Sequence, residues 1–190
     1  IRIMSYFIGV DIGGMSIKIG VTDEDGRILY KTVVTTARDA VADIENTARG
    51  INELLGEAGL TLSDIKGIGL GCPGAISSER GVVDILPNLG WVNVPLVKEF
   101  KKRFDTEIRM SNDANVAALA EALHGAAKGY KNCIMLTLGT GVGGGIIING
   151  KLYEGKEGKG AELGHATLVM DGYPCSCGRK GCIESYVSAT

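Results

Sequence analysis

The chain has 190 residues, which is enough for one domain or two small ones with a buried core. Twenty Lys and Arg against 22 Asp and Glu give a formal net charge of −2, so there is no general attraction to nucleic acid or to acidic membranes. The apolar runs, such as residues 6–10 and 146–148, are too short to span a bilayer. The chain opens without a secretory signal pattern, and its five cysteines have metal-like rather than paired spacing, so we expect a cytoplasmic protein.

The first elements predicted along the chain are three strands and a helix. Residues 1–5 precede them, and we expect these to be a leader or a cloning remnant. The apolar run 6–12 predicts a buried strand that ends in the turn Asp-Ile-Gly-Gly at 11–14. Strands over 17–22 and 27–36 flank a hairpin signal, Asp-Glu-Asp-Gly. A helix over 40–58 is predicted by apolar residues at helical spacing, namely Val41, Ile44, Ala48, Ile51 and Leu55.

The next part alternates strands and helices. An apolar strand over 66–71 is closed by Cys-Pro-Gly at 72–74, and Pro95 opens a helix that runs to about Phe104. A strand follows over 107–110. The alanine-rich stretch 114–127 then predicts a helix capped by Asn112 or Asp113.

After residue 132 the opening pattern repeats. Strands over 133–138, 143–148 and 151–153 are separated by a glycine turn at 139–141 and by Asn149-Gly150. Two copies of a βββαβα unit predict an α/β protein with two lobes, residues 6–127 and 128–190, whose glycine turns face each other across a cleft. The second copy stops at 190 as a helix begins near 184, so we expect a fragment of a longer protein.

The residues His165, Cys175, Cys177 and Cys182 form a candidate metal site. Three cysteines with a nearby histidine make a Cys₃His set, which zinc holds in a closed tetrahedron. The glycines of Cys-Gly-Arg-Lys-Gly-Cys let the thiolates converge. A disulfide and free buried thiols are the alternatives. With no position left for water, such a zinc would be structural and would order the loop that carries Glu162, His165 and Glu184.

Two glycine-rich turns are candidates for phosphate contact. Glycines at 13–14 and in Leu-Gly-Thr-Gly-Val-Gly-Gly-Gly at 138–145 leave backbone N–H groups free to face phosphate oxygens. Asp11, at a strand end, could hold hydrated Mg²⁺. The alternative is that both segments only make hairpins. Their matching positions in the two copies favour phosphate contact.

Three acidic residues have two interpretations each. Asp113 at a strand-to-helix junction is a helix cap or a general base that takes a proton from a hydroxyl attacking a phosphate. Glu162 and Glu184, on the segment ordered by the metal, are sugar ligands or solvated surface charges. His165, once bound to a metal, needs a partner for its second nitrogen, and a hydroxylated ligand could supply it.

Taken together, these motifs resemble the ROK family of repressors and sugar kinases, and its bacterial glucokinases in particular. The resemblance runs from Tyr6 to Thr190. It rests on DIGG at 11–14, CPGAI at 72–76, PNLGW at 87–91, SNDANVAALAE at 111–121, LGTGVGGG at 138–145, ELGH at 162–165 and CSCGRKGCIE at 175–184. It implies the actin-like ATPase (ribonuclease-H-like) fold in two lobes, with the second lobe incomplete.

The resemblance also implies a reaction and roles for matching residues. The reaction would be ATP-dependent phosphorylation of the 6-hydroxyl of a hexose, with glucose the preferred substrate and Asp113 the catalytic base. The sugar hydroxyls would be bound by Gly74, Asn88, Asn112, Asp113, Glu162, His165 and Glu184. The ATP phosphates and Mg²⁺ would face Asp11, Gly13, Gly14, Lys18, Gly139, Thr140 and Gly141. Lobe closure would exclude water.

Several alternatives stay open within this resemblance. Kinases of the family that act on N-acetylmannosamine, fructose or allose share the same motifs, some relatives use polyphosphate, and a sugar-binding protein without catalysis is a further alternative. The family's repressors carry a DNA-binding segment ahead of the first strand. Only residues 1–5 precede that strand in this sequence, so we expect no nucleic-acid binding. Members often form homodimers. Met15 stands where the family usually has Thr, and the segment that supplies the adenosine pocket lies beyond residue 190, so we expect weak ATP binding.

Overall fold

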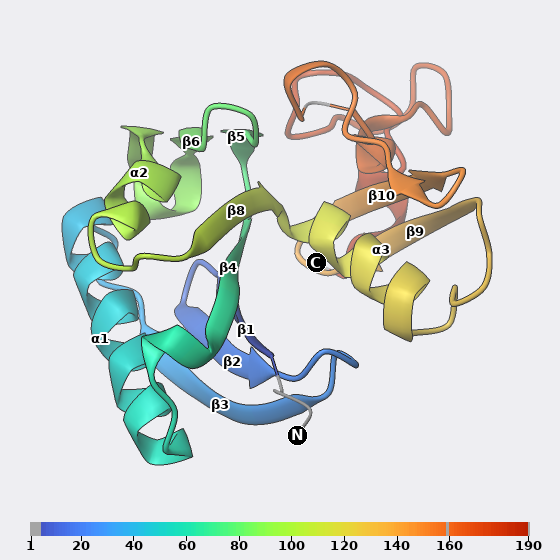
Figure 1. The fold of residues 1–190 in the computed structure, drawn as a ribbon. Helices are drawn as coiled ribbons and strands as arrows, with labels where there is room; N and C mark the ends of the chain where they lie inside the picture. Colours follow the sequence, from blue (N-terminus) through green and yellow to red (C-terminus); the bar gives the residue numbers. More distant parts are fainter. Residues whose placement is uncertain (1–4, 159, 190) are drawn as a thin grey trace. The chain divides into compact units, whose positions relative to one another are not determined.

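The computed structural model describes residues 5–158 and 160–189, so residues 1–4 of the expected leader lie outside the described part. The chain divides into two units between Asp113 and Ala114, and each unit is described by itself (Figure 1). This division assigns most of the helix after Asp113 to the second unit, whereas the sequence places that helix in the first lobe. The lobe boundary at 127/128 stays a prediction.

The first unit is built on a five-stranded sheet with the order β3-β2-β1-β4-β8 (Figure 1). The strands are β1 (Tyr6–Ile12), β2 (Ser16–Thr22), β3 (Ile28–Thr35), β4 (Ile65–Cys72) and β8 (Glu107–Asn112). β2 pairs antiparallel with β1 and β3, while β4 pairs parallel with β1 and β8. Parallel neighbours need long crossovers, and α1 (Ala40–Ala58) and α2 (Leu96–Lys101) lie within them.

Helix α1 begins and ends where the sequence predicts. The Asp39 side chain accepts a hydrogen bond from the Ala42 N–H at 2.8 Å, which satisfies one of the free donors of the first turn. At the other end Gly59 takes the left-handed conformation (φ 66°) that closes the helix.

The buried face of α1 differs from the predicted one in its first turn. Ile44, Ala48, Ile51 and Leu55 are buried as expected, but the Val41 side chain is 69% exposed. Asp43 is buried instead, and its carboxylate accepts the Ala37 N–H at 2.6 Å. A buried carboxylate with a backbone partner fixes the rotation of the first turn, which leaves Val41 in solvent.

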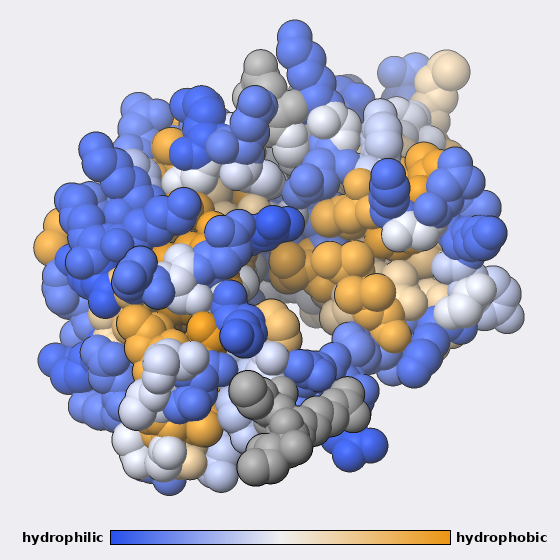
Figure 2. All heavy atoms as spheres, in the orientation of Figure 1, coloured by the Kyte–Doolittle hydropathy of each residue, from blue (hydrophilic) through white to orange (hydrophobic). Residues whose placement is uncertain are grey.

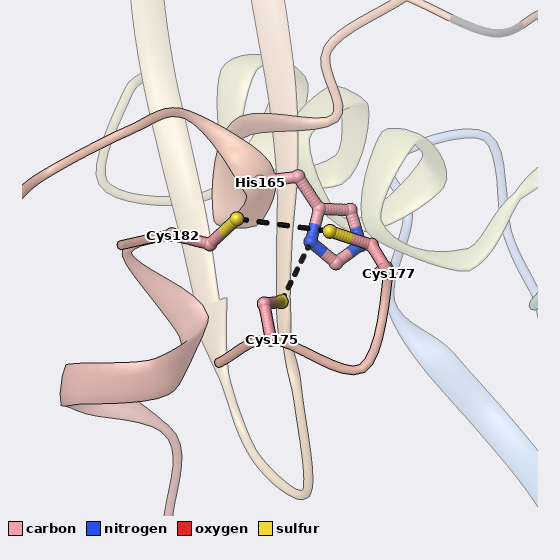
Figure 3. A group of neighbouring side chains, drawn as sticks. All are labelled: His165, Cys175, Cys177 and Cys182. Carbon is pink, nitrogen blue, oxygen red and sulfur yellow. Dashed lines mark hydrogen bonds between the residues drawn. The ribbon is translucent and has the colours of Figure 1, made fainter. Parts of the chain in front are cut away.

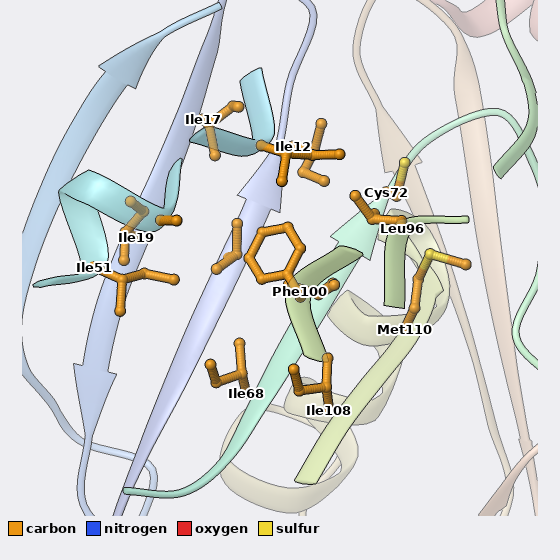
Figure 4. Packing of buried hydrophobic residues seen from close by; sticks show 14 of the residues in the cluster. Ile12, Ile17, Ile19, Ile51, Ile68, Cys72, Leu96, Phe100, Ile108 and Met110 are labelled. Atoms are coloured by element: carbon orange, nitrogen blue, oxygen red, sulfur yellow. The ribbon is translucent and has the colours of Figure 1, made fainter. Parts of the chain in front are cut away.

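The core of the first unit lies between its sheet and helices α1 and α2. Phe100 of α2 is 1% exposed and lies among Ile12, Ile68 and Ile108 of strands β1, β4 and β8 (Figure 4). α2 packs on β8, and α1 packs on β2 and β3. α2 is shorter than the predicted helix, because the N–H groups of Arg103 and Phe104 share the Phe100 carbonyl in a closing turn.

A second, small sheet of the first unit was not predicted. Its order is β5-β6-β7, with β5 (Ala75–Ser77), β6 (Val82–Leu86) and β7 (Trp91–Val94). Strands of three to five residues carry too little alternation to be recognised from the sequence. Two short 3₁₀ helices, Leu62–Asp64 and Pro87–Leu89, complete this unit, and the second of them precedes β7.

The second unit contains a three-stranded antiparallel sheet with the order β11-β10-β9. Its elements are α3 (Asp113–His124), β9 (Cys133–Leu138), β10 (Val142–Ile148), β11 (Lys151–Leu152), two 3₁₀ helices (Lys156–Gly158 and Leu163–His165) and α4 (Glu184–Val187). α3 lies directly on β10, because a Cβ at Gly145 would overlap the Ala118 methyl group and one at Gly143 would come within 2.9 Å of the Ala114 methyl group. These glycines therefore let the helix approach the strand closely.

The second unit leaves part of its apolar surface uncovered among the described residues. Alternate residues of β9, namely Ile134, Leu136 and Leu138, are exposed, and apolar side chains gather on this unit in Figure 2. In the part of the chain that the structure describes, none of the helices is long and apolar enough to cross a membrane.

Candidate functional site

The carboxyl ends of β1, β4 and β8 meet at one edge of the first unit's sheet. These strands are parallel, and their last residues pair as Asp11 with Gly71 and Cys72 with Asn112. Asp113 follows directly as the first residue of α3, where a carboxylate is favoured by the positive end of the helix dipole. The structure therefore brings Asp11, Asn112 and Asp113 to the same sheet edge.

The Cys72 thiol at this edge is influenced by two negatively charged side chains, Asp11 and Asp113. The thiol is fully buried, and burial is the main reason that its pKa is raised to about 12. The carboxylates of Asp113 and Asp11 contribute to the same rise, because negative charge disfavours a thiolate nearby. Cys72 is thus neutral at physiological pH, and both aspartates act on it from this edge. From the sequence, Cys72 was expected only as part of the turn that closes the strand.

Lys18 is the cationic partner of Asp11. The two residues lie opposite each other on β2 and β1, and the Lys18 Nζ donates to Asp11 Oδ2 at 3.1 Å. Both side chains are more than half exposed, so the pair contributes little to stability. It leaves a carboxylate and an ammonium group accessible beside the turn at Gly13 and Gly14, a combination suited to phosphate and a hydrated cation.

In the glycine turn after β1, backbone packing explains one of the two glycines, Gly13. A Cβ at Gly13 would lie 2.7 Å from the Ser16 carbonyl oxygen, to which the Gly13 N–H donates. At Gly14 the nearest atom is the Cβ of Asn88, at 3.8 Å. Asn88 is exposed in the Pro87–Leu89 helix, so this predicted sugar ligand lies beside the predicted phosphate turn.

Gly74 has the φ value that favours glycine. Its φ is 84°, and a Cβ there would lie 2.5 Å from the Ile85 carbonyl oxygen. The backbone after β4 therefore passes too close to β6 for a side chain at this position. Gly74 is therefore required by the backbone at this position, whatever ligand it contacts.

In the second unit, the glycines of residues 138–145 are mostly explained by packing. A Cβ at Gly141 would lie 2.7 Å from Glu184 Oε2, one at Gly144 would overlap the Leu163 side chain, and positions 143 and 145 face α3. Gly139 alone in this segment has no atom within 4 Å of its added Cβ. The Gly139 N–H, however, already donates to the Gly141 carbonyl oxygen at 3.0 Å, so the open space at this position does not leave that N–H free for phosphate.

Glu184 connects this glycine turn to the cysteine-rich loop. Its Oε2 accepts the Val142 N–H at 3.0 Å, and its Oε1 accepts the Ser176 hydroxyl at 2.9 Å. The Val142 N–H is the main reason that the Glu184 pKa lies below its ordinary value. Glu162, by contrast, is an exposed residue just before the Leu163–His165 helix.

The four predicted metal ligands come together in the second unit (Figure 3). The ligand atoms of His165, Cys175, Cys177 and Cys182 all lie within 4.8 Å of one another. The Cys177 and Cys182 sulfurs are 3.7 Å apart, and His165 Nδ1 is 3.6 Å from the Cys175 sulfur. All five cysteines are free, so the disulfide alternative is not what the structure has.

The 3.7 Å between the two sulfurs and the 3.6 Å between sulfur and nitrogen match the separations in a metal-centred tetrahedron. With Zn–S at about 2.3 Å and Zn–N at about 2.0–2.1 Å, tetrahedral geometry puts two sulfurs about 3.8 Å apart and a sulfur and a nitrogen about 3.6 Å apart. The Cys₃His set is also the chemistry that zinc prefers. The cluster could therefore hold a metal ion such as zinc.

The protonation of the cluster depends on its surroundings. A hydrogen bond from the Arg179 backbone N–H lowers the pKa of Cys177 to about 7, while burial raises the pKa of Cys182 to about 11. The Arg179 guanidinium also donates to the His165 carbonyl oxygen at 2.5 Å. Neither Ser176 nor Arg179 was predicted from the sequence, although each lies between two ligand cysteines.

The predicted sugar ligands are divided between the two units. Gly74, Asn88, Asn112 and Asp113 belong to the first, and Glu162, His165 and Glu184 to the second. The turn with Gly139, Thr140 and Gly141 is likewise in the second unit, and Asp11, Gly13, Gly14 and Lys18 are in the first. That each set forms one ligand site stays a prediction.

Comparison with known proteins identifies the family. The ROK family model matches residues 7–190. The chain belongs to the ROK family. The glucokinase of Thermotoga maritima is 41% identical over 187 residues, which are 96% of this chain and 57% of that protein. The xylose repressor of Bacillus subtilis is 32% identical over 96% of this chain and 48% of its own length.

Solved ROK structures agree with the fold. A ROK family glucokinase from Streptomyces griseus, in complex with glucose and AMPPNP, superposes with a TM-score of 0.80 at 39% identity. The match covers 97% of this chain and 57% of that one. The predicted α/β, actin-like ATPase fold is thereby confirmed. The chain spans 57% of the length of the curated glucokinases it matches.

Proposed function

We propose that the protein is an ATP-dependent hexose kinase that phosphorylates the 6-hydroxyl of its substrate, with glucose as the preferred hexose. The observation that carries this proposal is the pair of carboxylates, Asp11 and Asp113, at one carboxyl edge of the parallel strands. The identity of about 40% to bacterial glucokinases supports the same reaction. N-acetylmannosamine, fructose and allose are the alternative substrates.

Asp113 is the proposed general base. It is the first residue of α3 at the carboxyl edge of the parallel strands, and its carboxylate would accept the proton of the attacking hydroxyl. The product of that step is a protonated Asp113 and a phosphorylated sugar oxygen. Phosphoryl transfer needs mainly positioning and charge stabilisation, so the base contributes alongside the groups that hold the phosphates.

Asp11 and Lys18 are the proposed contacts to the phosphate end of ATP. An exposed carboxylate at a strand end fits Mg²⁺, which keeps most of its waters and takes one or two protein carboxylates. Bound there, Mg²⁺ would neutralise phosphate charge. Lys18 adds a positive charge 3.1 Å from Asp11. Of the two glycines in the turn, Gly14 has the more open surroundings, because the nearest atom to an added Cβ there is the Asn88 Cβ at 3.8 Å.

The Cys₃His cluster is proposed to hold a structural zinc ion. All four ligand positions are supplied by the chain, so the ion has no place for a reacting water. Its role would be to fix the loop that presents Glu162, His165 and Glu184 to a sugar. The separations of 3.6 and 3.7 Å between ligand atoms support this arrangement.

Calorimetric titration of the 190-residue chain with glucose, fructose, allose and N-acetylmannosamine tests the proposal, after its zinc content is measured. A coupled assay with ATP and Mg²⁺ follows. We expect glucose to bind tightest and to be turned over only at high ATP concentration, because weak ATP binding is expected of this chain. Binding without turnover would favour the sugar-binding alternative, a preference for another hexose would change the substrate, and failure of every hexose to bind would overturn the proposal.

Substitution of the base provides the matched test. Asp113→Asn removes the charge and keeps the shape, so turnover by a catalytically active form should fall by about 10²- to 10⁴-fold while sugar affinity is retained. Asp25→Asn, in the exposed turn between β2 and β3, is the control and should leave turnover unchanged. Near-normal turnover by Asp113→Asn would exclude it as the base.

A further inference from the structure

The segment after the last ligand cysteine runs directly to the glycine turn of the second unit. Cys182 is a member of the metal cluster, and α4 begins two residues later at Glu184. The Ile183 N–H donates to the Ala166 carbonyl at 2.9 Å, and the Ala189 N–H donates to the Gly139 carbonyl at 2.8 Å. This short segment is thus fixed near the cluster at its start and at the turn near its end.

Glu184 makes the central contact between the two regions. One carboxylate oxygen accepts the Val142 N–H at 3.0 Å, directly after the turn. The other accepts the Ser176 hydroxyl at 2.9 Å and lies 3.8 Å from the Cys175 sulfur. A metal-bound thiolate has no proton to donate, so with metal present the Ser176 hydroxyl is the partner that remains on that side. Hydrogen bonds to a carboxylate are stronger than those between neutral groups.

The glycine at position 141 is explained by the same contact. A side chain there would place its Cβ 2.7 Å from Glu184 Oε2 and would displace the carboxylate from the Val142 N–H. The turn therefore has a glycine where Glu184 enters. This is a reason independent of any ligand, and it shows that the turn and the carboxylate fit each other closely.

We propose that Glu184 is a positioning residue that couples occupancy of the Cys₃His cluster to the conformation of the turn at residues 139–142. Both partners on the cluster side are next to ligands: Ser176 lies between Cys175 and Cys177, and Glu184 follows Cys182 by two residues. A metal ion that joins these cysteines fixes both the carboxylate and the hydroxyl that orients it. The Val142 N–H then has an acceptor held in place.

The consequence for phosphate binding rests on the proposed function, in which residues 139–141 face the ATP phosphates. The coupling itself does not, because it concerns only the metal cluster, Glu184 and a backbone N–H. It can therefore be measured without sugar or nucleotide, and a failure of the kinase proposal would leave its test unaffected.

Amide hydrogen exchange of the 190-residue chain provides the test, read at Val142 by NMR with zinc bound and after chelation. Allosteric couplings are commonly about 5- to 150-fold, and we expect the Val142 exchange rate to rise within that range when zinc is removed. In Glu184→Ala the rate should be high with zinc present and should change little on chelation. By reciprocity, zinc affinity in that variant should fall by the same factor.

Two further variants make the result specific. Glu184→Gln keeps the shape of the side chain but has only one acceptor oxygen, so the Val142 N–H should lose part of its protection from exchange. This variant keeps the test available if Glu184→Ala fails to fold. Glu162→Gln removes an exposed carboxylate from the same unit and should leave Val142 protected. The proposal is overturned if Val142 exchange is the same in wild type and Glu184→Gln, or if chelation raises exchange equally at Val142 and at Ile147 in β10.

Discussion

Gly145→Ala tests whether packing explains the glycine-rich segment. A methyl group at this position would overlap the Ala118 methyl group and lie 3.0 Å from the Ala114 carbonyl oxygen. Overpacking of this kind costs about 1–3 kcal/mol, offset by about 0.4–1 kcal/mol from the reduced freedom of the unfolded chain. We therefore expect a loss of about 1–2 kcal/mol, which for a chain of this size lowers Tm by roughly 2–8 °C.

Gly139→Ala is the matched control for this experiment. It makes the same change in the same segment, but no atom lies within 4 Å of its added Cβ. Its stability should be unchanged or slightly increased, by about 0.4–1 kcal/mol at most. Thermal and urea unfolding of both variants measure the difference. A Gly145→Ala variant as stable as wild type would refute the close contact between α3 and β10.

Three other predictions concern the turn after β4 and the metal cluster. Gly74→Ala combines a φ of 84° with a Cβ 2.5 Å from the Ile85 carbonyl oxygen, so it should lower the free energy of unfolding in urea by about 2–4 kcal/mol. The control Gly90→Ala, which has a φ of 69° and open space, should lower it by about 1 kcal/mol. Equal losses in the two variants would contradict this prediction. Elemental analysis should find no bound zinc in Cys177→Ser, whereas Cys133→Ser, which lies outside the cluster, should keep its zinc. Zinc retained by Cys177→Ser would exclude this sulfur as a ligand. Binding of zinc should release more protons from the protein at pH 6 than at pH 8, because the Cys177 pKa of about 7 leaves this thiol protonated at pH 6 and mostly ionised at pH 8. Calorimetry in two buffers measures the number of protons released. Equal release at both pH values would count against that pKa.

Local sequence was sufficient wherever neighbouring residues determine the structure. Helix α1 was predicted over 40–58 from its apolar spacing, and the Asp39 cap and Gly59 that fix its ends in the structure are also its immediate neighbours in the sequence. The metal ligands were predicted as a group for a similar reason: three of the four are within eight residues of one another, and the loop between them is held by its own glycines. The repeat of strand, glycine turn and strand predicted an α/β protein, and the actin-like fold implied by the resemblance to the ROK family is confirmed.

The tertiary structure decided the contacts between distant residues, and with them the reasons for several glycines. Val142 and Glu184 are 42 positions apart, and no pattern in either segment shows that a carboxylate occupies the space beside Gly141. The burial of Asp43 in place of Val41 depends on the Ala37 N–H, which local helical spacing does not include. Spacing along the chain determines which residues form a helix, strand or ligand set, whereas the space and partners available to a side chain are set by elements that meet only in the folded protein.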